Sequence, residues 1–83
     1  MRRVEFSAQA DRSIRRLGER DRNRAADASL ALAEDPLAGK RLRGRFEKEG
    51  LRSYRVWPLR IIYRFDADSL RVVEVGHRRD IYR

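Results

Sequence analysis

The chain has 83 residues, enough for one small domain, residues 1–83, with a thin hydrophobic core. It contains no cysteine, which excludes disulfides and thiolate–metal clusters. It carries 21 Lys and Arg residues against 13 Asp and Glu, and the net charge of +8 favours a polyanionic partner. Its apolar runs are too short to span a bilayer, and no signal-peptide core follows Met1. We therefore expect a soluble, cytoplasmic protein that does not bind membranes.

The basic charge lies mainly in the second half of the chain. Residues 1–40 contain 9 basic and 7 acidic side chains, whereas residues 41–83 contain 12 basic and 6 acidic ones. Nearly all the cations are arginine, whose planar guanidinium binds phosphate in two places and stacks on bases. A GC-rich genome would explain the preference for arginine over lysine, but not the excess over acids. The second half is therefore the predicted binding region.

The chain is expected to begin with a strand and a helix. Residues 2–6 alternate between polar and apolar side chains, as a short strand does. Ser7 is a residue type that caps helices by accepting a bond from a backbone N–H. A helix starting there would place three apolar residues on one face, because their spacing follows the helical repeat. These residues are Ala10, Ile14 and Leu17.

A second helix is predicted to start near Asp21, which can act as its cap. It must end by Asp35, because Pro36 disfavours the helical conformation of the residue before it. Its apolar side consists of Ala25, Ala28 and Leu32. The link between the two helices, at Gly18, is short, so we expect an antiparallel helical hairpin.

The second half predicts a basic loop and then three strands. The loop covers residues 40–45, and Leu37 and Leu42 are expected to pin it to the core. Asp66, Ala67, Asp68 and Ser69 have the composition of a turn. The predicted strands are residues 51–57, 60–65 and 70–76. Because the links are too short for crossover helices, these strands should form an antiparallel meander.

The predicted fold is therefore α+β, with the order β-α-α-β-β-β and a helical hairpin on one face of a small, mainly antiparallel sheet. Side chains of a strand alternate between the two faces. On the middle strand, one face would carry Ile61, Tyr63 and Phe65, and the other Arg60, Ile62 and Arg64. We expect the apolar face under the helices and the arginine face exposed.

The end of the chain has the residue types of a phosphodiester site. The apolar strand of residues 70–75 runs into Gly76, and the only histidine, His77, follows it. The next residues include two arginines, Arg78 and Arg79, and the phenol of Tyr82. If this strand neighbours the one that carries Arg60, their cations would meet at one phosphate.

At this point the chain resembles the RelE/ParE superfamily of toxins from toxin–antitoxin pairs. The resemblance rests on three stretches, which are residues 41–44, 59–63 and 75–82. It covers essentially the whole order of elements. The RelE-like branch cleaves mRNA in the ribosomal decoding site, whereas the ParE-like branch inhibits DNA gyrase and lacks the nuclease residues. Both branches are silenced by a cognate antitoxin.

The resemblance implies roles for several residues. Arg60 would stabilise the reacting phosphate, Arg78 would act on the phosphate or the leaving group, and Tyr82 would stack near the substrate base. Arg55 approximately matches a basic residue on the preceding strand. A family lysine that serves as a candidate base falls near Ser53, so the identity of the base stays open.

RNA cleavage without a metal needs a base for the 2′-OH, cations for the phosphorane and an acid for the 5′-oxygen. His77 has the side chain whose pKa lies nearest neutrality, so it is a candidate base or acid. Arginine remains protonated and suits transition-state charge. The remaining cations are expected to bind RNA, and they are Lys40, Arg41, Arg43, Arg45, Arg64 and Arg79.

Several of these residues have a simpler interpretation. His77 could cap or pack, and Arg60 or Arg64 could be solvated strand charges. The basic loop could serve solubility alone. Trp57 and Tyr54 could stack bases, but a small domain needs aromatic residues, so we expect them in the core. One histidine and no cysteine argue against a metal site, and no phosphate-binding glycine motif points to a cofactor.

The sequence thus favours a toxin of a type II toxin–antitoxin system that acts as a ribosome-dependent mRNA endoribonuclease. Its expected partners are an antitoxin, in a hetero-oligomer, together with the ribosome and mRNA. Two alternatives remain open. One is a ParE-like inhibitor of DNA gyrase without nuclease chemistry, and the other is a basic module that only binds RNA or the ribosome.

Overall fold

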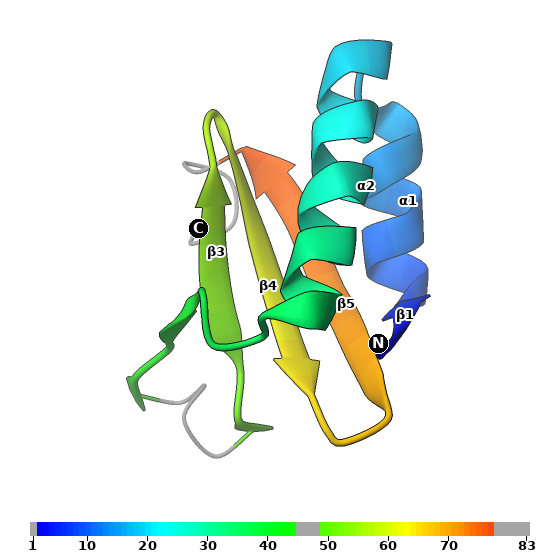
Figure 1. Ribbon diagram of the computed structural model, residues 1–83. Helices are drawn as coiled ribbons and strands as arrows, with labels where there is room; N and C mark the ends of the chain where they lie inside the picture. Colours follow the sequence, from blue (N-terminus) through cyan, green and yellow to red (C-terminus); the bar gives the residue numbers. More distant parts are fainter. Residues whose placement is uncertain (1, 45–48, 78–83) are drawn as a thin grey trace.

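The computed structural model describes residues 2–44 and 49–77 and contains two helices and five strands (Figure 1). In chain order these elements are β1 (Arg3–Phe6), α1 (Ala8–Arg16), α2 (Glu19–Glu34), β2 (Lys40–Arg41), β3 (Arg52–Val56), β4 (Leu59–Phe65) and β5 (Ser69–His77). The α+β class and the helical hairpin on one face of the sheet are confirmed. The short strand β2 lies where the sequence predicted only a loop.

The five strands form one sheet in the order β1-β5-β4-β3-β2. The predicted meander of β3, β4 and β5 is confirmed, since each of these strands pairs antiparallel with the next. β2 extends the sheet antiparallel to β3, and β1 pairs parallel with β5 at the other edge. The sheet is therefore mixed. β1 can pair parallel with β5 because the two helices separate it from the meander along the chain, whereas the short links within the meander require antiparallel pairing.

The helix boundaries follow local capping. Ser7 accepts a hydrogen bond from the N–H of Ala10 (3.0 Å), as predicted, and its hydroxyl donates to the carbonyl of Val73 (2.6 Å). α2 begins at Glu19 with Gly18 as its N-cap, so the prediction that Asp21 caps this helix is wrong. Asp21 lies in the first turn, where a carboxylate is favoured by the helix dipole. α2 ends at Glu34, as Pro36 requires.

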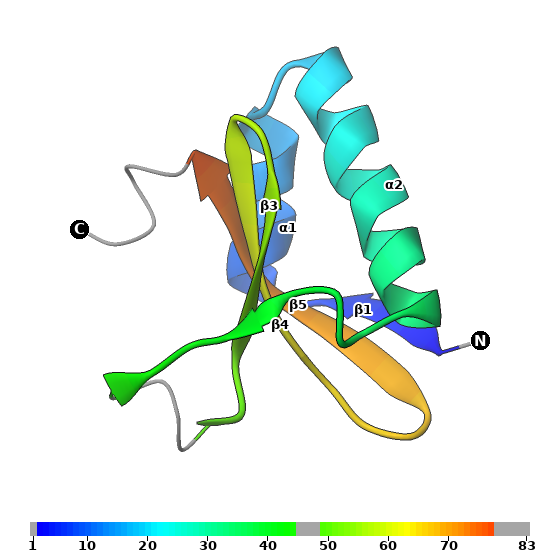
Figure 2. The ribbon, with the colours of Figure 1, turned by 60° about the vertical axis from the view of Figure 1, so that its left-hand side comes forward.

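The core lies between the helices and one face of the sheet (Figures 1 and 2). Small residues of α2 allow the helix to approach the strands closely, and Leu32 supplies the largest buried side chain of that helix. The core cluster consists of Ala10, Ala25, Ala28, Leu32, Ala33, Leu59, Ile61, Tyr63, Leu70, Val72 and Val75. Within the described residues, no helix is both long and apolar enough to cross a membrane.

A register irregularity in β5 keeps its apolar residues on the core side. Ile62 pairs with Glu74, but Tyr63 pairs with Val72, so Val73 is the extra residue of a bulge. Without the bulge, Val72 and Val75 would face opposite sides of the sheet, since they are three positions apart. With it, both are buried in the same core.

Two of the four residues expected to contact the core, Leu37, Leu42, Tyr54 and Trp57, are exposed in the structure. Leu37 and Trp57 are each 66% exposed, so neither belongs to the core. Leu42 and Tyr54 are half-buried, and Tyr54 packs against the core cluster. Trp57 is exposed because it lies in the two-residue link between β3 and β4, where the backbone leaves the sheet.

A buried hydrogen-bond network holds the segment between α2 and β2. The hydroxyl of Tyr63 donates to the carbonyl of Pro36 (2.6 Å) and accepts from the N–H of Gly39 (3.0 Å). Arg52 donates to the carbonyl of Gly39 (2.6 Å). A Cβ atom on residue 39 would lie 2.8 Å from the carbonyl oxygen of Ser53, so this close approach requires glycine. The network thereby fixes where β2 starts.

We expect Tyr63→Phe to lower the free energy of unfolding by about 1–3 kcal/mol, because it leaves two buried backbone groups without their partner. Burial raises the pKa of the Tyr63 hydroxyl above its ordinary value of 10.0. The contribution of this hydroxyl to the free energy of unfolding is therefore complete below pH 10, and it falls as the pH rises through the folded-state pKa. Urea unfolding of both proteins from pH 8 to pH 11 would measure this. A stability gap that stays constant across that alkaline range would contradict the prediction.

Candidate nucleic-acid interface

The face of the sheet opposite α1 and α2 carries a row of arginines. Residues that pair across strands share a face, so the register assigns these positions directly. Arg55 of β3 pairs with Arg60 of β4, and Arg64 of β4 pairs with Arg71 of β5. We call these four residues the arginine face. Figure 2 shows the helices on one side of the sheet only, and no helix within residues 2–44 and 49–77 covers the arginine face.

A hollow of about 480 Å³ opens beside the first arginine pair. Three strands contribute cations to its lining, with Arg55 from β3, Arg60 from β4, and Lys40 and Arg41 from β2. Its remaining lining residues are Ala38, Leu42, Ser53 and Tyr54. We call this space the β2–β4 hollow. Four cations from separate strands around one concave space form a site suited to a polyanion.

Among the cations that line the β2–β4 hollow, Arg60 is held by a hydrogen bond to a neighbouring strand. Its side chain is half-buried, and its Nη1 donates to Oγ of the buried Ser53 (3.2 Å). Arg55 lies directly opposite in the cross-strand register and is exposed. Two like charges at paired positions repel each other, which costs stability in the free protein. An anion bound between them would remove that repulsion, so the pair favours a phosphate ligand.

A second hollow of about 640 Å³ lies on the other side of β2 and shares Lys40, Arg41 and Leu42 with the first. Arg43 also lines it, as does Arg52, whose side chain anchors Gly39. The predicted basic loop is therefore partly a strand, with cations facing hollows on both of its sides. Arg45 lies outside the described residues.

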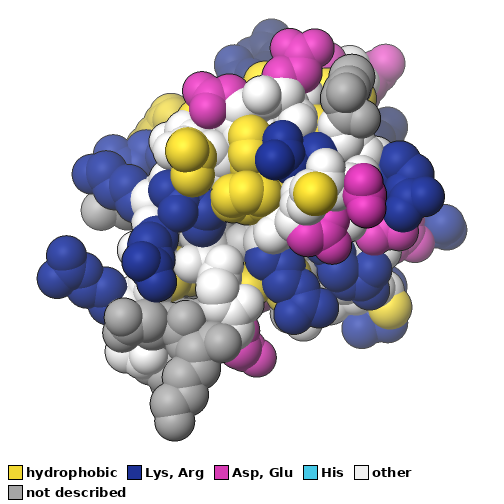
Figure 3. Space-filling view, turned by 60° about the horizontal axis from the view of Figure 1, so that its bottom comes forward, with side chains coloured by type: hydrophobic (Ala, Val, Ile, Leu, Met, Phe, Trp, Pro, Cys, Tyr) yellow, Lys and Arg dark blue, Asp and Glu magenta, His cyan; other side chains and the backbone are white. Residues whose placement is uncertain are grey.

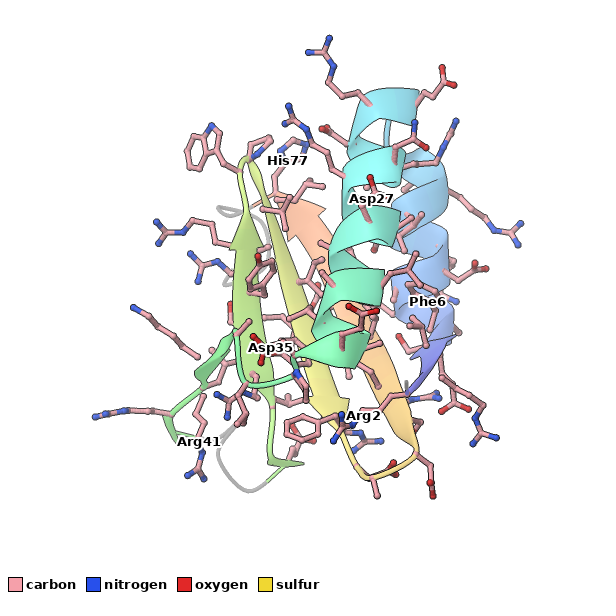
Figure 4. The ribbon with its side chains drawn as sticks, in the orientation of Figure 1. Arg2, Phe6, Asp27, Asp35, Arg41 and His77 are labelled. Atoms are coloured by element: carbon pink, nitrogen blue, oxygen red, sulfur yellow. The ribbon has the colours of Figure 1, made fainter. Side chains whose placement is uncertain are left out.

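The structure does not bring His77 together with Arg60. His77 pairs with Leu59, which is buried under the helices, whereas Arg60 pairs with Gly76 on the arginine face. Consistent with this register, His77 lines a separate hollow of about 200 Å³ with residues of α1 that include Ser13. Figure 4 shows His77 and Arg41 at opposite ends of the sheet. The imidazole and the Arg60 guanidinium therefore face opposite sides of the sheet, and the predicted meeting of Arg60 with Arg78 stays a prediction, because Arg78 lies outside the described residues.

The other predicted site residues have different positions. Arg64 is exposed on the arginine face, but it does not line the β2–β4 hollow. Three candidates, Arg78, Arg79 and Tyr82, lie outside the described residues. Among the residues that the structure describes, no group of three or more His, Cys, Asp or Glu side chains could hold a metal ion. The hollows offer hydroxyls and guanidinium groups instead, which bind anions directly.

Sequence reasoning missed two contributors to this site. Ser53 was noted only as a loose match to a family lysine, yet its hydroxyl orients Arg60. Arg71 was assigned no role, although it pairs with Arg64. The period-two pattern of β5 could have revealed Arg71, but the bulge at Val73 interrupts that pattern. Figure 3 views the end of the molecule with the β4–β5 turn, where a small apolar patch lies among basic and acidic side chains and no histidine is visible.

Comparison with known proteins agrees with this architecture. Residues 4–82 match the sequence model of a family described as the ParE toxin of the type II toxin–antitoxin system parDE. A search of curated protein sequences returned no significant match.

Solved structures include several similar chains. One from the RelBE2 toxin–antitoxin complex of Mycobacterium tuberculosis has a TM-score of 0.84 and 28% identity, covering 93% of this chain and 98% of that chain. Isolated RelE of E. coli has a TM-score of 0.75 and 23% identity, and the match covers 99% of this chain and 92% of that chain. A chain of the E. coli DinJ–YafQ complex has a TM-score of 0.76 and 19% identity, and the match covers 99% of this chain and 98% of that chain. The two E. coli structures show a shared fold.

The family match extends over nearly the whole chain and ends close to its C-terminus. The similar structures share the fold over almost the whole length of both chains. The chain therefore belongs to the ParE toxin family of type II toxin–antitoxin systems, within the RelE/ParE superfamily.

Proposed function

We propose that the protein is a toxin that binds mRNA on the ribosome and cleaves it. The observation that carries this proposal is the Arg55–Arg60 pair, which shares one hollow with Lys40 and Arg41 on the face away from the helices. The four side chains offer charge and bidentate hydrogen bonds to a phosphodiester. The sequence resemblance to the RelE-like branch adds the reaction type.

In the proposed reaction, the 2′-OH of one nucleotide attacks the adjacent phosphorus and the bond to the 5′-oxygen breaks. Arg60, oriented by Ser53, would neutralise the negative charge that develops on the phosphorane, and Arg55 would assist from the neighbouring strand. The proton donors and acceptors remain predictions. His77 stays the candidate base or acid, and it lies on the helix side of the sheet. The resemblance implies that Arg78 would act on the phosphate or the leaving group and that Tyr82 would stack near the substrate base.

An antitoxin is the proposed protein partner. The chains from M. tuberculosis RelBE2 and from E. coli DinJ–YafQ were both solved as toxin–antitoxin complexes. An acidic antitoxin segment that folds on binding would neutralise the arginine face and exclude RNA from the β2–β4 hollow. This arrangement would silence the toxin by competition for the same cations.

The family description itself favours a second candidate function. The matching family is named for the ParE toxin of parDE, and the ParE-like branch inhibits DNA gyrase without nuclease chemistry. The arginine face would then bind an acidic surface of the enzyme or its DNA. Both functions need cations, so the discriminating observation is the cellular target.

Expression without an antitoxin should arrest growth, and the double variant Arg55→Ala with Arg60→Ala should restore it. Mapping of mRNA ends in arrested cells should show cuts clustered within translated frames. Arg20→Ala, which removes an exposed charge from α2, is the matched control and should remain toxic. Intact mRNA together with broken DNA would instead identify the gyrase mechanism. Full toxicity of the double variant would refute the assigned site.

The affinity for a short single-stranded RNA should depend steeply on salt, because each neutralised phosphate contributes a slope of about 0.7 to log K against log salt. Removing both Arg55 and Arg60 should lower that slope by about 1.4. Arg20→Ala should leave the slope unchanged, since this side chain lies on α2, on the helix side of the sheet. Titration at several salt concentrations would measure the slopes. Equal slopes for wild type and the double variant would contradict the phosphate contacts.

A further inference from the structure

Trp57, the only tryptophan of the chain, is placed at the surface rather than in the core. It occupies the two-residue link between Val56 and Leu59, which are paired across β3 and β4. Its side chain remains 66% exposed. Burial of an aromatic side chain is one of the main sources of stability in a domain this small. An indole that the fold leaves in water is therefore available to a ligand.

The backbone that presents Trp57 is held from two directions. Nη1 of Arg24, on α2, donates to the carbonyl oxygen of Trp57 (3.1 Å). On the other side, Leu59 is fully buried in the core and continues into β4. The link is therefore tied both to the sheet and to the helix. A side chain presented from a fixed backbone loses little entropy when a ligand orders it.

The neighbours of Trp57 carry positive charge. Arg55 precedes it by two residues, which places their Cα atoms about 7 Å apart along an extended strand. Arg24 lies beside it through the hydrogen bond to its carbonyl. Arg55 pairs with Arg60 and lines the β2–β4 hollow, so Trp57 follows a lining residue of the hollow at a distance of two positions along the chain. A single-stranded nucleic acid seated in the hollow would need to extend only past Arg55 to reach the indole.

We propose that Trp57 is a stacking platform for an unpaired RNA base adjacent to the phosphate held by Arg55 and Arg60. This inference rests on the proposed function and adds a base-binding position to it. An exposed aromatic ring close to a cationic hollow is a combination by which proteins bind single-stranded nucleic acids. A protein partner would instead favour a tryptophan set among apolar neighbours. Within residues 2–44 and 49–77, the other large exposed apolar residues lie elsewhere, on α2 (Leu30), on the α2–β2 segment (Leu37) and on β1 (Phe6).

The single tryptophan makes the proposal directly measurable. We would titrate the full chain with a short single-stranded RNA at low salt and follow its tryptophan fluorescence. Stacking should quench the indole emission as the complex forms. Inorganic polyphosphate is the control ligand, because it offers the same charge without bases and should bind with little quenching. Quenching of equal size by both ligands would overturn the proposal.

Variants then test the energetic contribution of the ring. Trp57→Leu should weaken binding of a labelled RNA about 5- to 150-fold, the range that corresponds to stacking of one base. Trp57→Phe should recover part of that loss, because it retains an aromatic face. Leu30→Ala removes exposed apolar surface from α2 and should bind as wild type. Polyphosphate affinity should be the same for all four proteins, which separates stacking from an effect on folding.

The outcomes also separate this inference from the proposed function. RNA binding that depends on Arg55 and Arg60, but is unchanged in Trp57→Leu, would refute the stacking platform alone. Wild-type protein that fails to bind RNA at all would refute the proposed function. Loss of RNA affinity in Trp57→Leu with polyphosphate binding intact would support both.

Discussion

The one-sided packing of the helices constrains everything else in this domain. A chain of this size can build only one core, and α1 and α2 form it by covering a single face of the sheet. The strands alternate their side chains, so residues that are not under the helices must face the other way. Because many of these positions are arginine, burial on one side produces a cationic surface on the other. The predicted binding face is thus a consequence of how the core forms.

The buried Tyr63 network connects that core to the candidate site. Tyr63 belongs to the core cluster, yet its hydroxyl reaches the backbone of Pro36 and Gly39, just before β2. Arg52 fixes the same segment from β3. As a result, Lys40 and Arg41 are held at the edge of the sheet, where they complete the β2–β4 hollow. The stability of the core and the shape of the anion-binding surface therefore depend on a shared set of hydrogen bonds.

Much of the fold could be predicted because it depends on local signals. Ser7 as a cap, Pro36 as a helix end and the alternation in β4 each act through neighbouring residues, and each was confirmed. The misplaced cap at Asp21 shows the limit of this reasoning, since Gly18 in an extended conformation caps the helix three residues earlier. Trp57 was expected in the core on general grounds. Its exposure depends on where the first strand of the meander ends, because β3 stops at Val56 and Trp57 belongs to the link rather than to the predicted strand.

The sequence by itself determined the class of the fold, the arginine-rich second half and the resemblance to RelE/ParE toxins. Each of these depends on residue identity and short-range order. Only the tertiary structure decided which charges meet. The strand register places Arg55 beside Arg60, joins Lys40 to them through β2 and sends His77 to the helix side. Register is set by the bulge at Val73 and by packing across the whole core, so no local pattern could reveal it.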